Sequence, residues 1–160
     1  MPRFPARVGS PIVHSKENID RFIEMAIKGN PVDKATVPDR VKNAALLAFI
    51  WKDDDLAAIS AIKKPTENYK NCVFKKAGIS ERSSTYSREL GYVQTHTEYR
   101  RSGLSGEIVH AIIKKNGGRP VFATTENTYM KRILESNGFT KIGSEYLAKD
   151  GKGLLSLFVR

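Results

Sequence analysis

Residues 99–106, which read YRRSGLSG, combine the residue types with which a polypeptide binds an anion. The arginines add positive charge and charge-assisted donors, while the serines and glycines let a ligand approach the main chain closely. Because the segment joins a strand-like run to a helix-like run, its N–H groups would lie at a helix N-terminus, where phosphates bind. The alternative is an ordinary strand-to-helix turn whose glycines only shape the backbone. We predict a pyrophosphate site formed by Arg100, Arg101, Ser102, Gly103, Leu104, Ser105 and Gly106.

Glu89 is the candidate for acid–base chemistry, because it lies on the strand-like run that leads into this turn. Its neighbours Leu90, Tyr92 and Val93 could partly desolvate the carboxylate, a setting that suits a general base. The alternative is a surface glutamate paired with Arg88 or with a lysine. The three histidines of the chain show no metal-ligand spacing, so we expect no metal site.

The hydrophobic pattern predicts the elements that must position these residues. Helices are expected at 15–28, after Pro38, after the turn from Leu104, and at 127–139. Strands are expected at 44–51, 56–63, 86–95, 120–125, 139–147 and 153–159. The first two strands read as a hairpin, and residues 64–85 read as an irregular loop with at most a short strand. Helices that cross between strands imply a mixed α/β sheet with a parallel pair at its centre.

The composition indicates a globular protein, with 40% apolar and 28% charged residues in 160 positions. We predict a single domain over residues 1–160. Cys72 is the only cysteine, which excludes an intrachain disulfide and suits a reducing compartment. The first residues lack the apolar core of a signal peptide, and the sequence contains no apolar run long enough to span a bilayer. We therefore expect a cytoplasmic protein that does not associate with membranes.

The formal net charge of +10 predicts attraction to polyanions such as nucleic acid, phosphorylated ligands or acidic proteins. However, the basic residues occur mostly as scattered pairs, and no block of five or more is present. A solvated basic surface and a dedicated nucleic-acid face therefore both stay open.

Two segments resemble motifs of the GCN5-related N-acetyltransferases, the GNAT superfamily. The acyl-CoA pyrophosphate loop of that family reads Arg/Gln-x-x-Gly-x-Gly/Ala, and it falls on Arg100, Gly103 and Ser105, where serine replaces the usual glycine or alanine. The second match is NTYMKRILESNGF, which resembles the closing motif of the family and begins at Asn127. The resemblance covers residues 86–146 well, and it implies a GNAT-like, mostly antiparallel sheet with a splayed parallel pair and flanking helices.

The resemblance also implies roles for individual residues. Acetyl-CoA would be the co-substrate, with its pantetheine arm on Val93 and Thr95 and hydrogen-bonded by Asn127, for which a helix N-cap is the alternative. Glu89 has the spacing of the general base in the histone-acetyltransferase branch. The usual general-acid tyrosine is replaced by Leu134, so the acid is left open; Tyr92, Tyr99 and Tyr146 are candidates.

The implied function is an N-acetyltransferase in which a primary amine attacks acetyl-CoA directly in a ternary complex. The acceptor is open between a protein lysine or N-terminus, a small amine and an aminoacyl-tRNA, and the basic charge favours an acidic partner. A monomer and a homodimer are both compatible with the sequence. The alternatives are a non-catalytic acyl-CoA-binding protein and a basic nucleic-acid-binding protein on the same scaffold.

Overall fold

The computed structural model of the protein describes residues 4–29 and 34–160. The strands are β1 (Arg7–Gly9), β2 (Leu46–Lys52), β3 (Asp55–Lys63), β4 (Arg88–Thr95), β5 (Val121–Thr125), β6 (Thr140–Leu147) and β7 (Leu154–Val159). The α-helices are α1 (Lys16–Gly29), α2 (Val37–Lys42), α3 (Glu67–Lys76), α4 (Leu104–Asn116) and α5 (Thr128–Ser136). Short 3-10 helices are η1 (Pro11–Val13), η3 (Ser80–Thr85) and η4 (Thr97–Tyr99).

Within the described residues, seven strands form one mixed sheet in the order β1-β2-β3-β4-β5-β7-β6. The ladder between β4 and β5 is parallel, with Arg88 opposite Val121 and Glu89 opposite Phe122. The ladders of β1 with β2, β2 with β3, β5 with β7 and β6 with β7 are antiparallel. The predicted α/β fold, a mostly antiparallel sheet with a central parallel pair, is therefore confirmed.

The chain packs as two compact units, each built from two separate segments. The first unit comprises Met1–Lys64 and Leu90–Gly117, and the second comprises Pro65–Glu89 and Gly118–Arg160. The boundary between them therefore falls inside β4, after Glu89. The prediction of one domain over residues 1–160 stays a prediction.

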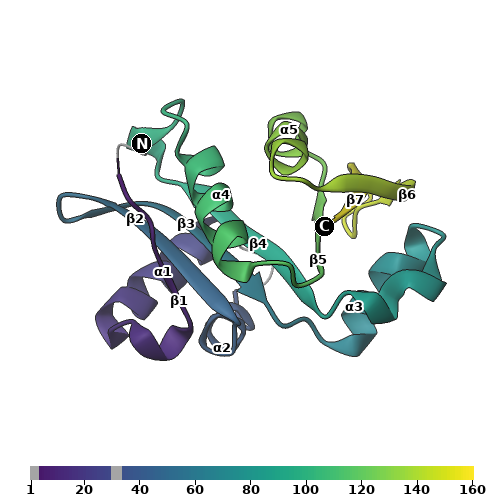
Figure 1. The fold of residues 1–160 in the computed structure, drawn as a ribbon, viewed down its shortest axis with the longest axis horizontal. Coiled ribbons are helices and arrows are strands. Elements are labelled where there is room, and N and C mark those ends of the chain that lie inside the picture. Colours follow the sequence, from purple (N-terminus) through teal and green to yellow (C-terminus); the bar gives the residue numbers. More distant parts are fainter. Residues whose placement is uncertain (1–3, 30–33) are drawn as a thin grey trace. The chain divides into compact units, whose positions relative to one another are not determined.

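In the first unit, helices cover both faces of the β2–β3 hairpin (Figure 1). Helices α1 and α2 pack on one face, and α4 packs on the other. Helix α1 begins where predicted, because the Ser15 hydroxyl accepts a hydrogen bond from the Asn18 N–H at 3.1 Å. Its apolar stripe buries Phe22 against Phe49 of β2, with ring centroids 5.3 Å apart.

In the second unit, α3 packs on strands β5 and β7 through its own apolar stripe. Phe74 lies at the centre of this contact and is fully buried. Its ring centroid is 5.6 Å from that of Tyr86 and 5.4 Å from that of Phe122. The aromatic contacts thus attach α3 firmly to the sheet.

The prediction of an irregular loop at residues 64–85 is wrong, because this segment forms α3 and then η3. The N-cap of α3 is Thr66, whose hydroxyl accepts a hydrogen bond from the Tyr69 N–H at 3.2 Å. The buried positions of this helix have regular helical spacing, but the first of them is a lysine, which hides the pattern. They are Lys70, Val73, Phe74 and Ala77.

The other predicted elements are present, with boundaries shifted by a few residues. The predicted helix after Pro38 is α2, which begins at Val37, while residues 30–33 lie outside the described residues. Strand β1 was not predicted, because three residues carry too short a pattern. In the part of the chain that the structure describes, no helix combines the length and apolarity needed to cross a bilayer.

Candidate functional site

In the first unit, the turn between η4 and α4 has an unusual backbone. Arg101 has a φ of 63° and Gly103 a φ of 81°, so both adopt the left-handed conformation. Glycine takes this conformation readily, whereas an arginine is strained there by about 1–3 kcal/mol. Backbone strain of this kind is concentrated at functional sites, which agrees with a binding role for the turn.

Helix α4 begins in a way that leaves its first N–H groups accessible. Gly103 is the N-cap, and the Glu107 N–H makes the hydrogen bond to its carbonyl, at 3.1 Å. The three preceding N–H groups lie at the positive end of the helix dipole. A Cβ atom placed on Gly103 or Gly106 would meet no other atom within 4 Å, so a ligand could approach both positions. Such a helix N-terminus is a general site for a phosphate or another anion.

Hydroxyl groups brace this turn against the preceding elements. The Ser102 hydroxyl donates to the carbonyl of Tyr99, and the Oγ atoms of Thr95 and Ser105 are 2.8 Å apart. The second contact joins the end of β4 to the start of α4. Serine in place of the usual glycine or alanine of the motif therefore has a structural partner.

Strand β4 is distorted just before the residues expected to meet the pantetheine arm. Tyr92 has a φ of 52°, which is rare for an aromatic residue and places a local irregularity in the strand. Its side chain is 8% exposed, and its hydroxyl has no hydrogen-bond partner among the described residues. Val93 and Thr95 follow on the same strand and are both half-buried. The strain at Tyr92 could not be detected from the sequence, because it is a property of the backbone.

In the second unit, Glu89 is buried at the end of the parallel ladder. It is 3% exposed, and its Oε2 accepts a hydrogen bond of 2.8 Å from the Tyr69 hydroxyl. Tyr69 lies on α3, in the segment predicted to be a loop, so the sequence analysis missed it. A carboxylate so deeply buried needs such a donor, because burial without a partner is costly.

A second phenol lies within electrostatic reach of the same carboxylate. Burial raises the pKa of Tyr146 on β6 to about 12, and the charge of Glu89 and the Cys72 thiol add to this effect. Desolvation also raises the pKa of the Tyr69 hydroxyl far above its usual value, with the Glu89 charge as the next cause. Both phenols therefore stay protonated at neutral pH and can only donate or accept hydrogen bonds there.

The helix that carries Tyr69 is joined to the strand that carries Tyr146. Strand β6 is irregular between Ile142 and Tyr146, and within this bulge the Ser144 N–H donates to the Ala77 carbonyl at 2.9 Å. Gly143 has a φ of 68°, and a Cβ atom on it would lie 2.5 Å from the same carbonyl oxygen. Only glycine therefore permits this close approach without displacement of α3.

Asn127, also in the second unit, is the N-cap of α5. Its Oδ1 accepts a hydrogen bond from the Met130 N–H at 2.9 Å, so the capping interpretation describes one of its contacts. Asn127 and Lys131 line an open cavity of about 650 Å³ beside the β6–β7 hairpin. The exposed amide of Asn127 thus lies where a ligand could reach it.

The candidates for the general acid lie in different surroundings in the structure. Leu134 is fully buried in the core and takes no part in chemistry. The Tyr99 hydroxyl donates to Asp55 in the first unit at 2.7 Å, whereas Tyr146 lies near Glu89. Among residues 4–29 and 34–160, no group of three His, Cys, Asp or Glu side chains could hold a metal ion.

Comparison by sequence identifies no relatives. No protein-family model matches the chain, and no curated protein resembles it significantly in sequence.

Comparison by structure does identify similar proteins. An acyl-CoA N-acyltransferase from Pseudomonas aeruginosa superposes with a TM-score of 0.70 at 12% identity, over 98% of this chain and 99% of that one. A GNAT-family acetyltransferase from Bacillus cereus superposes with a TM-score of 0.64 at 12% identity, over 98% and 96%. The protein yncA from Salmonella typhimurium, solved with its cofactor acetyl-CoA, superposes with a TM-score of 0.62 at 12% identity, over 99% and 94%. The chain therefore has the fold of the GNAT acetyltransferases, the superfamily that its two motifs resemble.

Proposed function

We propose that the protein transfers an acetyl group from acetyl-CoA to a primary amine, with Glu89 as the general base. The observation that carries this proposal is the buried carboxylate of Glu89, which a phenol holds at 2.8 Å inside a GNAT fold. A buried, hydrogen-bonded carboxylate on a strand before an anion-binding turn has the features required of a base.

Acetyl-CoA is the co-substrate that the turn would hold. Its diphosphate would accept hydrogen bonds from the first N–H groups of α4 and from Arg100, and the openness at Gly103 and Gly106 supports this assignment. Val93 and Thr95 would meet the pantetheine arm through their backbone groups. Asn127 would donate to the same arm through its side-chain amide, since its oxygen already caps α5.

The reaction removes two protons from the ammonium nitrogen and returns one of them to sulfur. An alkyl amine is almost fully protonated at neutral pH, so Glu89 would take the first proton from the ammonium group before attack. The amine nitrogen then forms a bond to the thioester carbonyl carbon, the carbon–sulfur bond breaks, and the second proton passes from the nitrogen through water to the leaving thiolate. A backbone N–H near Val93 would stabilise the developing oxyanion, an effect worth about 3–4 kcal/mol.

The test of this function uses the purified protein and ¹³C-labelled acetyl-CoA in a cell extract. Mass spectrometry would identify the acetylated product and thereby choose between protein amines, small amines and aminoacyl-tRNA. We expect label on a nitrogen atom of at least one acceptor, dependent on the protein. Tight acetyl-CoA binding with no labelled product would instead favour a non-catalytic acyl-CoA-binding protein.

The buried Leu134 at the expected acid position is the observation that favours this second candidate. Without a general acid, a GNAT fold could bind acetyl-CoA as a sensor and not turn it over. The hydrogen bond from Tyr69 to Glu89 argues for catalysis, because a sensor has no use for a buried base.

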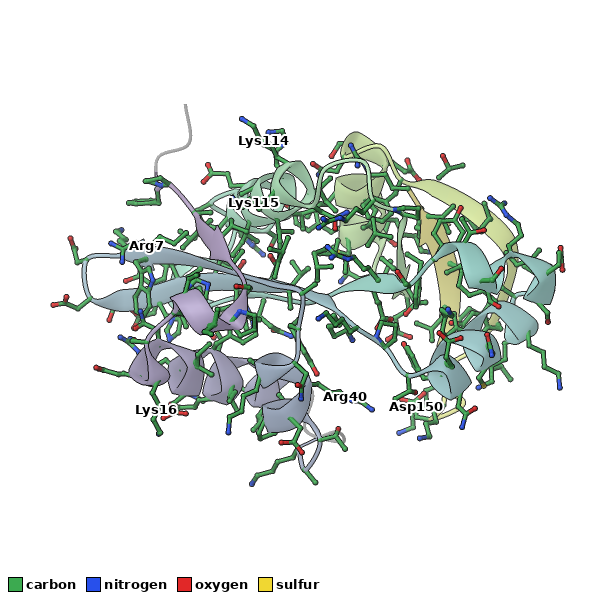
Figure 2. All side chains as sticks on the ribbon, turned by 60° about the horizontal axis from the view of Figure 1, so that its bottom comes forward. Arg7, Lys16, Arg40, Lys114, Lys115 and Asp150 are labelled. Carbon is green, nitrogen blue, oxygen red and sulfur yellow. The ribbon has the colours of Figure 1, made fainter. Side chains whose placement is uncertain are left out.

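A nucleic-acid-binding role finds less support. Figure 2 shows five basic side chains of the first unit on four separate elements, namely Arg7 on β1, Lys16 on α1, Arg40 on α2, and Lys114 and Lys115 on α4. A nucleic-acid interface would gather such residues on one face. The scattered arrangement fits a solvated basic surface better.

A further inference from the structure

We propose that Tyr69 is a positioning residue, which fixes the carboxylate of Glu89 in one orientation for proton transfer. The inference rests on the proposed role of Glu89 as the base. It adds a residue from α3, outside the two motifs that led to that role.

The contact has the geometry of a strong hydrogen bond. The Tyr69 hydroxyl and Oε2 of Glu89 are 2.8 Å apart, and the carboxylate is 3% exposed. Although Tyr69 as a whole is 40% exposed, its hydroxyl end points inward to this buried group, so the exposed part lies elsewhere on the residue. A bond from a neutral phenol to a carboxylate stabilises the ionised form over the acid.

Tyr69 is held rigidly enough to orient its partner. It occupies the first turn of α3, where its N–H donates to the capping hydroxyl of Thr66 at 3.2 Å. One turn further along, Phe74 is fully buried between aromatic rings, and the Ala77 carbonyl accepts a hydrogen bond from β6. A hydroxyl supported in this way keeps its place during a reaction, which a surface side chain would not.

Other ionisable groups on α3 and β6 have interactions of their own. On α3, Lys70 pairs with Glu67 at 3.0 Å, and the Cys72 thiol acts on Tyr146. On β6, burial and the Glu89 charge raise the pKa of Tyr146 to about 12, so it is neutral at working pH.

Strands β5 and β7 add no charge to this environment, since Val121–Thr125 and Leu154–Val159 contain no ionisable side chain. The Tyr69 hydroxyl itself stays protonated, because desolvation and the nearby carboxylate raise its pKa well above neutrality. Tyr69 is thus a permanent donor across the pH range in which the base must work.

The test is Tyr69→Phe, which removes only the hydroxyl oxygen. The ¹³C signal of the Glu89 carboxyl, assigned by its loss in Glu89→Gln, is compared by NMR between the variant and the wild type at neutral pH. We expect the signal to shift in Tyr69→Phe, because the hydrogen bond from the phenol to the carboxyl is lost. An unchanged signal, with the variant folded by circular dichroism, overturns the proposal.

Kinetics provide a second readout, with acetyl-CoA and a short peptide that carries one lysine and a free amino terminus. In Tyr69→Phe kcat falls on the order of tenfold, while KM for acetyl-CoA is unchanged. The control is Tyr129→Phe, on an exposed side chain of α5, which should leave both quantities at the wild-type value.

The proposed base and the proposed positioning residue can be refuted separately. If Glu89→Gln acetylates the peptide at the wild-type rate, the proposed base is wrong, and NMR still decides whether Tyr69 holds the carboxylate. If Glu89→Gln is inactive and Tyr69→Phe shows the wild-type kcat, the base stands and the positioning role is refuted.

Discussion

Single residues carry the chemistry proposed for this protein, and Glu89 is the most informative of them. Its carboxylate is buried almost completely, yet it is not an isolated charge, because the Tyr69 hydroxyl donates to it. Burying such a group is costly unless it is hydrogen-bonded, so Tyr69 is a necessary partner of the carboxylate.

Replacing Glu89 by glutamine tests this residue directly. Glutamine keeps the size of the side chain but cannot accept a proton, so kcat should fall by about 10²–10⁴-fold. The dissociation constant for acetyl-CoA, measured by calorimetry, should stay the same, because the carboxylate is proposed to act on the amine. Glu81→Gln, on an exposed glutamate of the same unit, is the matched control. A wild-type rate in Glu89→Gln across pH 6–9 would remove it as the base.

The phenol of Tyr146 leads to a prediction at alkaline pH. Its pKa in the folded protein is about 12, mainly because of burial, whereas an unfolded tyrosine ionises near 10. A raised folded pKa contributes stability that is complete below pH 10 and is lost as the pH rises toward 12. In an absorbance titration of the phenolates, Tyr146→Phe should lose a late-ionising signal. Its unfolding free energy should also decline less between pH 10 and 12 than that of the wild type.

At the scale of elements, the start of α4 decides whether acetyl-CoA can bind. Gly103→Val would add a branched side chain at a left-handed position that faces open space, and so would strain the turn and block the approach of a diphosphate. We expect acetyl-CoA affinity to fall by at least tenfold in calorimetry. Gly117→Val is the control, since Gly117 at the other end of α4 also has a positive φ, 67°, and also faces open space. Equal losses in both variants would contradict a specific role for the turn.

The clarity of its apolar pattern decides whether an element can be predicted from the sequence. The hairpin β2–β3 and helix α4 have clear apolar periodicity, so their type and position were predicted correctly. Helix α3 was missed because Lys70 occupies the first position of its buried stripe and a lysine there reads as solvent-facing. The contact between Tyr69 and Glu89 was beyond prediction for the same reason, since it exists only when residues 64–85 fold as a helix.

For the site, the sequence predicted Glu89 and the turn after Arg100, and their roles stay predictions. The structure adds what a motif cannot contain, namely the left-handed Arg101 and the strained Tyr92. Backbone conformations of this kind depend on the surrounding packing and not on local sequence.

At the scale of the whole molecule, each compact unit is assembled from segments that are distant in sequence. The second unit joins Pro65–Glu89 to Gly118–Arg160, so neither unit can be obtained as one uninterrupted piece of chain. Glu89 belongs to this unit, and the turn after Arg100 belongs to the first. Contacts of such long range favour slow folding relative to helical proteins of similar size.

The net charge of +10 is the other property of the whole molecule, and it gives a test against the nucleic-acid alternative. A scattered basic surface should bind a short single-stranded RNA weakly, and should lose that binding when salt rises from 50 to 200 mM. Fluorescence anisotropy measures this directly. A submicromolar dissociation constant for RNA at 200 mM salt would instead support a nucleic-acid-binding function. The affinity for acetyl-CoA, measured under the same conditions, shows which of the two ligands the protein prefers.

The close contact between Gly143 and the Ala77 carbonyl limits which residues can occupy position 143. An alanine there would push α3 outward through the Ala77 carbonyl, and the displacement would travel along the helix to Tyr69. Gly143 lies more than fifty residues along the chain from Glu89 and touches no proposed ligand. A substitution at this glycine is therefore expected to disturb the contact between Tyr69 and Glu89 from a distant position in the sequence.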